Sequence, residues 1–162
     1  MFDNPINSKI AEFLTGIGIG VVPGEIAEQT VLPGILVDHG TLRIDEAKLV
    51  SPGDILHEAG HLAVAPAEKR GRLYNDVSKN AGDELAAIAW SWAATLHLGL
   101  DPALLFHPHG YKGAAASLLE NFSEGRYFGV PLLQWMGLTW ETERAQQHGV
   151  PPFPHMVQWL RD

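Results

Sequence analysis

The chain has 162 residues, 46% of them hydrophobic, which is enough for one domain with a buried core and too short for a separate substrate-binding lobe. A formal net charge of −8 argues against nucleic acid and anionic membrane as partners, since both need a concentrated basic surface. Cysteine is absent, which excludes disulfides, thiolate metal sites and thiol nucleophiles. We therefore expect a single domain over residues 1–162.

The N-terminal residues 1–5 lack the basic and apolar regions of a signal peptide, and no run of about 18 apolar residues is present for a membrane span. We therefore expect the protein in the cytoplasm. Asn4 and Pro5 are typical of a helix start, and the predicted helix has one apolar side and ends near Gly16. The short apolar run 17–22 is rich in glycine, which indicates a strand or a loop.

Residues 35–45 predict a β-hairpin. Two short apolar segments, 35–37 and 42–44, flank His39 and Gly40, which are suited to a tight turn. This hairpin comes directly before the segment that carries the clearest chemical motif.

Residues 51–66 carry the start and stop signals of a helix. Ser51 is a preferred N-cap residue, Pro52 suits the first helical position and Asp54 stands at the third, which together form a variant of the capping box. Pro66 ends the pattern. The helix has enough apolar surface to be buried, contributed by Ile55, Leu56, Ala59, Leu62, Ala63 and Val64.

Within this predicted helix, residues 57–61 read His-Glu-Ala-Gly-His. Positions four apart differ by about 40° around a helix axis, so His57 and His61 project from one face and can share a tetrahedral Zn²⁺. Glu58 would then stand beside the open position of the ion, where it can accept a proton from water whose pKa the ion lowers to about 7. The alternative is two partly buried histidines and a surface glutamate on an ordinary helix.

The charged segment 67–79 follows and would connect the two helices of a metal site. A loop of this kind can hold the carboxylate of a substrate, although charge runs are usually solvated connectors. Its basic residues are Lys69, Arg70, Arg72 and Lys79.

A zinc site needs a third protein ligand. A third histidine six residues beyond His61, with a glycine midway, is excluded because Ala67 and Val64 occupy these positions. The remaining common solution is a carboxylate from a second helix, and Glu84 provides one at the start of an apolar segment that we expect to cross the core. The alternative is that Glu84 only complements the helix dipole.

Residues 106–113 are a second candidate segment. Attack on a carbonyl needs a hydrogen-bond donor for the developing oxyanion, and His109 or Tyr111 could supply it. Either residue could instead cap the following helix, predicted from Ala114 to Phe122, or simply pack. His107 is an alternative third metal ligand. The remaining residues predict short packed helices, one of them from Thr139 to His148, and a C-terminal segment in which Trp159 folds back onto the domain.

The motif and the downstream glutamate resemble those of the zincin metallopeptidases, in particular the gluzincin branch, over residues 51–90. The resemblance implies that His57, His61 and Glu84 bind zinc and that Glu58 is the general base. It also implies that a strand of the hairpin lies beside the motif helix, where an exposed edge would allow an extended peptide substrate to pair with it. The alternative is a hairpin with a purely structural role.

One feature of the gluzincin pattern is missing from the sequence. Ile88 stands where the family has an aspartate, four residues after the ligand glutamate. That aspartate supports a zinc histidine, so Asp83 or Asp54 would have to take its place.

We predict an α+β fold, mostly helical, with a small β-sheet and a zincin-like helix pair around one Zn²⁺. The predicted function is zinc-dependent hydrolysis, most readily that of a small metallopeptidase acting on a peptide or protein substrate. The first alternative is a zincin-shaped regulatory or peptide-binding module that keeps the ion for stability, and the second is a metal-free helical protein. An open coordination position favours hydrolysis, whereas a fourth protein ligand favours a structural site. The sequence does not predict the oligomeric state.

Overall fold

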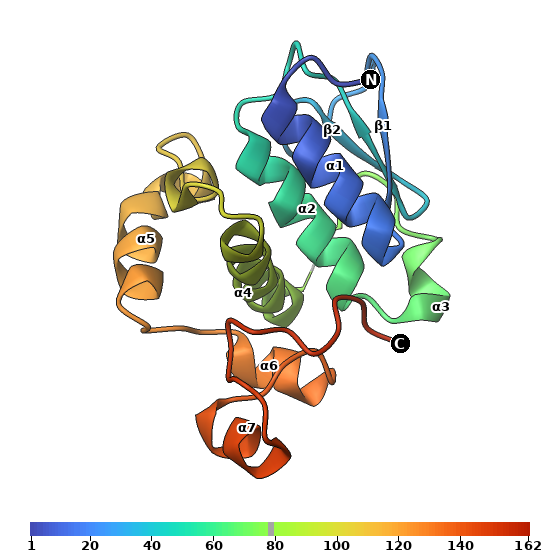
Figure 1. Ribbon diagram of the computed structural model, residues 1–162. Helices are drawn as coiled ribbons and strands as arrows, with labels where there is room; N and C mark the ends of the chain where they lie inside the picture. Colours follow the sequence, from blue (N-terminus) through green and yellow to red (C-terminus); the bar gives the residue numbers. More distant parts are fainter. Residues whose placement is uncertain (78–79) are drawn as a thin grey trace.

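The computed structural model describes residues 1–77 and 80–162, and it places one long helix, α2, between a small sheet and a second long helix, α4 (Figure 1). The sheet consists of β1 (Gly20–Pro23), β2 (Ile35–Asp38) and β3 (Thr41–Ile44). The α-helices are α1 (Pro5–Ile17), α2 (Pro52–Val64), α3 (Ala67–Arg70), α4 (Ala81–His97), α5 (Ala115–Ser123), α6 (Val130–Trp135) and α7 (Thr142–His148), and two short 3-10 helices are η1 (Pro102–Leu104) and η2 (Tyr111–Gly113).

The strand order is β1-β3-β2, with β1 parallel and β2 antiparallel to β3. The predicted hairpin is therefore confirmed as β2 and β3. His39 and Gly40 form its turn with φ values of 52° and 84°, the left-handed backbone that tight hairpin turns require. The run 17–22, expected as a strand or a loop, ends α1 and then enters strand β1.

The outer edge of β2 is not free. The amide of Asn75 donates to the carbonyl of Val37 at 2.8 Å, and the amide of His39 donates to the carbonyl of Leu73 at 2.9 Å. Because β3 is paired on both sides, this edge was the one that the hairpin could have offered to a substrate strand. The expectation of strand addition here is wrong for the part of β2 that residues 73–75 cover.

Helix α2 begins and ends where the sequence predicts, but its cap differs. Ser51 occupies the N-cap position without a capping hydrogen bond, and its hydroxyl donates instead to the carbonyl of Leu104 at 2.6 Å. Gly53 makes this contact possible, since a Cβ there would lie 2.1 Å from the same carbonyl oxygen. The start of α2 is therefore fixed by the segment that follows α4, rather than by its own side chains.

Helix α4 crosses the core as predicted. The side chain of Asn80 caps its start by accepting from the amide of Gly82 at 2.8 Å. The fully buried Trp90 donates from Nε1 to the carbonyl of Trp159 at 2.9 Å, and the Trp159 ring lies edge-on to Phe13 at 5.0 Å between centroids. Trp159 therefore folds back onto α1 and α4, which confirms the prediction for the C-terminal segment.

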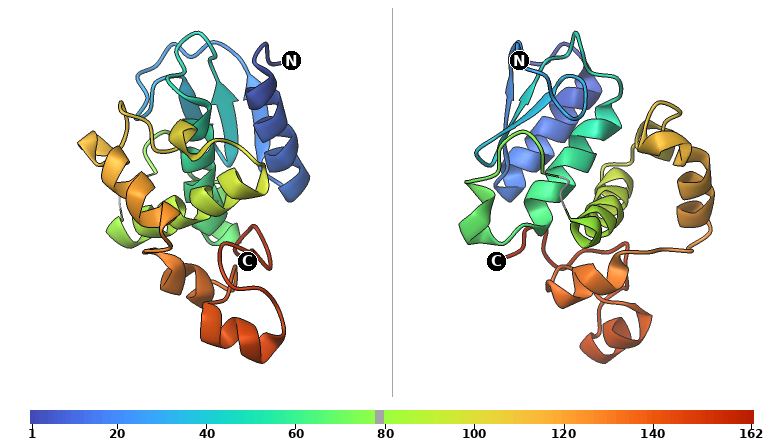
Figure 2. Two further views of the ribbon diagram at one scale, coloured as in Figure 1. Left: turned by 60° about the vertical axis from the view of Figure 1, so that its left-hand side comes forward. Right: turned by 180° about the vertical axis from the view of Figure 1, so that it is seen from behind.

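One hydrophobic cluster joins α1, the sheet, α2, α4 and the later short helices, and α6 and α7 lie at the end of the molecule opposite the sheet (Figure 2). The predicted late helices are present as α5 and α7. The predicted α+β, mostly helical fold is confirmed. In the part of the chain that the structure describes, no helix is long and apolar enough to cross a membrane.

Candidate metal centre

Helices α2 and α4 bring the three predicted metal ligands together. One ligand atom from each of His57, His61 and Glu84 lies within 4.8 Å of the others. Nε2 of His57 is 3.2 Å from Oε1 of Glu84, and Nε2 of His61 is 2.7 Å from Oε2 of the same carboxylate. The motif helix and the following helix therefore converge at one carboxylate.

The geometry and the donor set fit Zn²⁺. Ligands held about 2.0–2.1 Å from a tetrahedral ion are separated by roughly 3.3 Å, so the pair involving His57 already has the required spacing and the pair involving His61 needs to open by roughly 0.6 Å. Although Nε2 of His61 and Oε2 of Glu84 are 2.7 Å apart, they do not form a hydrogen bond, and both atoms are buried without another hydrogen-bond partner among the described residues. Such atoms are costly to leave unsatisfied, and a cation between them removes that cost. Two imidazoles and one carboxylate are an established ligand set for catalytic zinc.

Excess negative charge surrounds the two imidazoles. Burial by itself lowers the pKa of His57, but the carboxylates of Glu84, Glu58 and Asp54 together raise it above the usual value. Burial by itself raises the pKa of Glu84. The two imidazoles beside it have the larger effect, so its pKa lies well below the usual value. The pocket therefore stabilises positive charge, which is what a divalent cation brings.

A glycine inside the motif sets the distance between the two ligand helices. A Cβ on Gly60 would lie 2.7 Å from the carbonyl oxygen of Ala87 on α4. No real side chain fits there without moving one helix. The close approach that brings Glu84 within reach of the histidines therefore depends on this position having no side chain.

Glu58 lies in the wall of a cavity of about 840 Å³, which His57 and Glu84 also line. It is only 4% exposed, and burial raises the pKa of its carboxyl group although the imidazoles of His57 and His61 lower it in part. A carboxylate with a raised pKa is a stronger base at neutral pH than an exposed one. The rest of this cavity wall is mainly apolar and includes Leu32, Leu85, Ile88, Leu118 and Phe128.

Tyr111 contacts a ligand histidine directly. Its hydroxyl is 3.1 Å from Nδ1 of His57, and the two rings are perpendicular, with 5.2 Å between centroids. With a metal ion on Nε2 of His57, Nδ1 would carry the proton and donate to the phenol oxygen, which would fix the orientation of the imidazole. Burial and the nearby carboxylates raise the pKa of Tyr111, so the phenol keeps its proton. The sequence predicted Tyr111 for the site but missed this contact.

Asp54 does not support a zinc histidine. Its carboxylate is 2.6 Å from Nε2 of His107, and both side chains are buried. Burial raises the pKa of Asp54 despite this partner. The interpretation of His107 as a third metal ligand is wrong, because its ring faces Asp54 and ties the loop that precedes Tyr111 to α2.

Asp83 does not support a zinc histidine either. It lines a different cavity, and Nδ1 of His61 has no hydrogen-bond partner within residues 1–77 and 80–162.

His109 is exposed and lies in the rim of the larger cavity, on the same loop as Tyr111. The structure thus brings both predicted oxyanion donors to the cavity that contains Glu58. Whether either residue polarises a substrate stays a prediction.

The predicted basic cluster divides into different roles. Arg70 donates to the backbone carbonyls of Leu62, Ala65 and Arg161 at 2.6–3.1 Å, so it holds the C-terminal segment against the end of α2. Lys69 is exposed. Lys79 lies outside the described residues.

Comparisons with known proteins add no family to this geometry. No protein-family model matches the chain, no curated protein matches its sequence, and no solved structure matches its fold. The candidate site is therefore characterised by its own ligand atoms and by the cavity beside them.

Proposed function

We propose that this chain is a zinc-dependent hydrolase of amide bonds, most simply a small metallopeptidase. The observation that carries the proposal is the convergence of His57, His61 and Glu84, in which Nε2 of His61 and Oε2 of Glu84 are buried without a hydrogen bond, next to a cavity that contains the buried carboxylate of Glu58. A binding site needs only the first of these features, and hydrolysis needs both.

When bound, Zn²⁺ supplies Lewis acidity that lowers the pKa of water at its open position to about 7. Glu58 accepts the proton from the attacking water as the water oxygen bonds to the carbonyl carbon of the substrate. Glu58 then passes this proton to the amide nitrogen as the carbon–nitrogen bond breaks. The products are a carboxylic acid and an amine, and Glu58 returns to its starting state.

A second contribution comes from the loop that carries Tyr111 and His109. With zinc on Nε2 of His57, Nδ1 would donate to the phenol oxygen, and the phenol hydrogen would be free to donate into the cavity. A donor at this place stabilises the oxyanion that forms on the substrate carbonyl. His109, at the rim, is the other residue of this loop that can supply such a bond.

The rival function is a regulatory or peptide-binding module that holds the ion only for stability. Structural zinc sites are normally closed by four protein ligands. Among the described residues, the group of potential ligands contains two histidines and one glutamate and has no fourth member. This favours an open coordination position and therefore hydrolysis.

The substitution Glu58→Gln tests the proposal, because it keeps the shape of the side chain and removes the base. We expect the variant to retain one zinc per chain and to lose amide hydrolysis by at least about 10²-fold. Zinc content by atomic absorption and turnover of a pool of quenched fluorescent peptides are the two measurements. Glu12→Gln, an exposed glutamate on α1, is the matched control and should hydrolyse as the wild type does. Undiminished turnover in Glu58→Gln would contradict the proposed role.

A further inference from the structure

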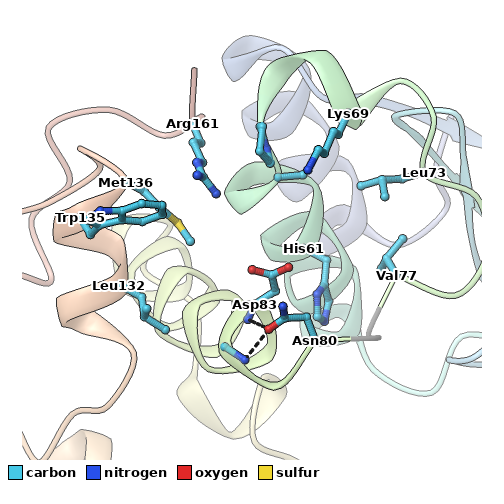
Figure 3. A pocket seen from close by; sticks show the side chains of 13 residues that line it. His61, Lys69, Leu73, Val77, Asn80, Asp83, Leu132, Trp135, Met136 and Arg161 are labelled. Carbon is cyan, nitrogen blue, oxygen red and sulfur yellow. Dashed lines mark hydrogen bonds between the residues drawn. The ribbon is translucent and has the colours of Figure 1, made fainter.

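A second cavity borders the candidate metal centre on the side of His61. Its volume is about 440 Å³, and its wall is made by the ends of α2 and α4 together with α3, α6 and the C-terminal segment (Figure 3). Its walls are apolar on two sides, with Trp135, Met136 and Leu132 facing Leu73 and Val77. His57 and Glu58 line the larger cavity and His61 lines the smaller one, so the ligand group has a cavity on either side.

Two cations reach over the smaller cavity. Figure 3 shows Lys69 from α3 and Arg161 from the C-terminal segment directed toward the same space, above the carboxylate of Asp83. Neither cation forms an ion pair within 4.0 Å among the residues that the structure describes. Two positive charges and one negative charge therefore leave this cavity with a net positive charge.

The guanidinium group of Arg161 is held in place. Its Nη1 donates to the carbonyl of Val64 at 3.2 Å, and its central carbon lies 5.0 Å from the centre of the Trp135 ring. Trp135 is 74% exposed, although its large ring is apolar. A charged group held in this way keeps its other N–H donors available to an anion, at little cost in side-chain entropy.

Strand addition along the covered part of β2 gives no help with substrate binding. Residues 73–75 occupy the β2 edge that an extended peptide would need. Recognition therefore has to come from the two cavities, and cavities of this size take a short substrate more readily than a long extended chain.

We infer that the substrate is a short acylated peptide or amino acid whose leaving portion ends in a free carboxylate, and this inference rests on the proposed hydrolase function. The carboxylate binds Lys69 and Arg161 in the smaller cavity, and the apolar acyl portion fills the larger cavity beside Glu58. The chemical polarity of a peptide fixes this direction, because its terminal carboxylate always lies on the amine side of the scissile bond. Addition of water gives an apolar carboxylic acid on one side of the metal centre and a free amino acid or short peptide on the other.

The test compares two substrates that differ only at the end of the leaving portion. One is an N-benzyloxycarbonyl dipeptide of leucine with a free carboxylate, and the other is its C-terminal amide. We expect wild-type kcat/KM to be about tenfold higher for the acid. Calorimetric titration of the zinc-loaded Glu58→Gln variant with both compounds, which measures binding without turnover, should show the same preference.

Two variants remove the preference, and a third is the control. Lys69→Met should reduce the acid-to-amide ratio by about threefold to fivefold, because Lys69 is exposed, and Lys69→Met combined with Arg161→Gln should bring the ratio close to one. Arg72→Met removes an exposed cation from the same segment outside the cavity, and it should leave the ratio unchanged. Zinc content and the midpoint of urea denaturation, measured for each variant, separate lost recognition from damage to the fold.

The two proposals fail in different ways. Equal hydrolysis of acid and amide, or a ratio that survives the double substitution, would overturn the carboxylate subsite and leave the hydrolase proposal in place. Tighter binding of the acid by Glu58→Gln without any turnover by the wild type would support the subsite and contradict the hydrolase proposal.

Discussion

The two helices that carry the candidate metal ligands and the loop that carries Tyr111 and His109 reach the same cavity by different means. Helices α2 and α4 present the ligands through regular geometry, because His57 and His61 are one turn apart and Glu84 follows a capped helix start. Residues 105–113 are largely irregular, and their position depends on contacts with distant parts of the chain. The structure of the first region depends on local sequence, and that of the second on tertiary contacts.

This difference separates two kinds of function within one site. The helix pair holds its ligands on a rigid scaffold, as metal binding requires. The loop is attached to that scaffold at two points, the buried pair of His107 with Asp54 and the hydrogen bond of Tyr111 to His57. Substitutions of the ligands on the helices should therefore abolish zinc binding, whereas substitutions in the loop should only lower the affinity for zinc.

The largest effect is expected from removing both motif histidines. His57→Ala combined with His61→Ala should reduce bound zinc from one per chain to background, since Glu84 alone is a weak ligand. Metal analysis after dialysis against a weak chelator measures the zinc content per chain. The matched control replaces His39 and His148, which lie outside the ligand group, and should keep its zinc. Zinc that persists in the first variant would place the ion elsewhere.

A smaller effect is expected from closing the gap between the ligand helices. Gly60→Ala forces α2 and α4 apart at Ala87 and should lower the free energy of unfolding by about 1–3 kcal/mol, with weaker zinc binding as a consequence. Urea denaturation of the wild type and of Gly60→Ala measures the change in the free energy of unfolding. Gly16→Ala is the control, because a Cβ there meets nothing within 4 Å and alanine favours the helix; it should be as stable as the wild type or slightly more so. Equal losses in the two variants would show that helix spacing is not specifically restricted at Gly60.

The smallest effect is expected in the loop. Tyr111→Phe removes the hydroxyl that would accept from Nδ1 of His57 when zinc occupies Nε2, and it should weaken zinc binding by about tenfold, with less than about 1 kcal/mol lost from the free energy of unfolding. Competition with a chromogenic chelator measures the affinity. Tyr127→Phe, whose ring packs on Phe153, is the control. Unchanged affinity together with a reduced kcat would assign Tyr111 to the substrate carbonyl rather than to the histidine.

The helices, the hairpin and the histidine pair of the candidate site could be predicted because each depends on short sequence spacings. The i, i+4 histidines require only a helix, and the exclusion of a third histidine directs attention to Glu84. The hairpin follows from two apolar segments around His39 and Gly40. These features need no knowledge of what lies far away in the chain.

The partners of the ligands could not be predicted in the same way. Asp54 was interpreted as part of a helix cap, yet it is buried opposite His107, 53 positions later. Its place one turn before His57 was the only local sign of a buried role. Ser51 similarly bonds to Leu104 rather than to its own helix. A side chain with several available partners is settled by tertiary packing, which short spacings do not encode.

The pairing of residues 73–75 with β2 also bears on how the protein behaves in concentrated solution. A three-stranded sheet with an open, apolar outer strand would invite a second copy to add its own strand, which is a common start of aggregation. The segment that connects α3 to α4 covers part of that strand with two backbone hydrogen bonds from the same chain. The connection between the two candidate ligand helices therefore also blocks this part of β2 from pairing with a second copy of the chain.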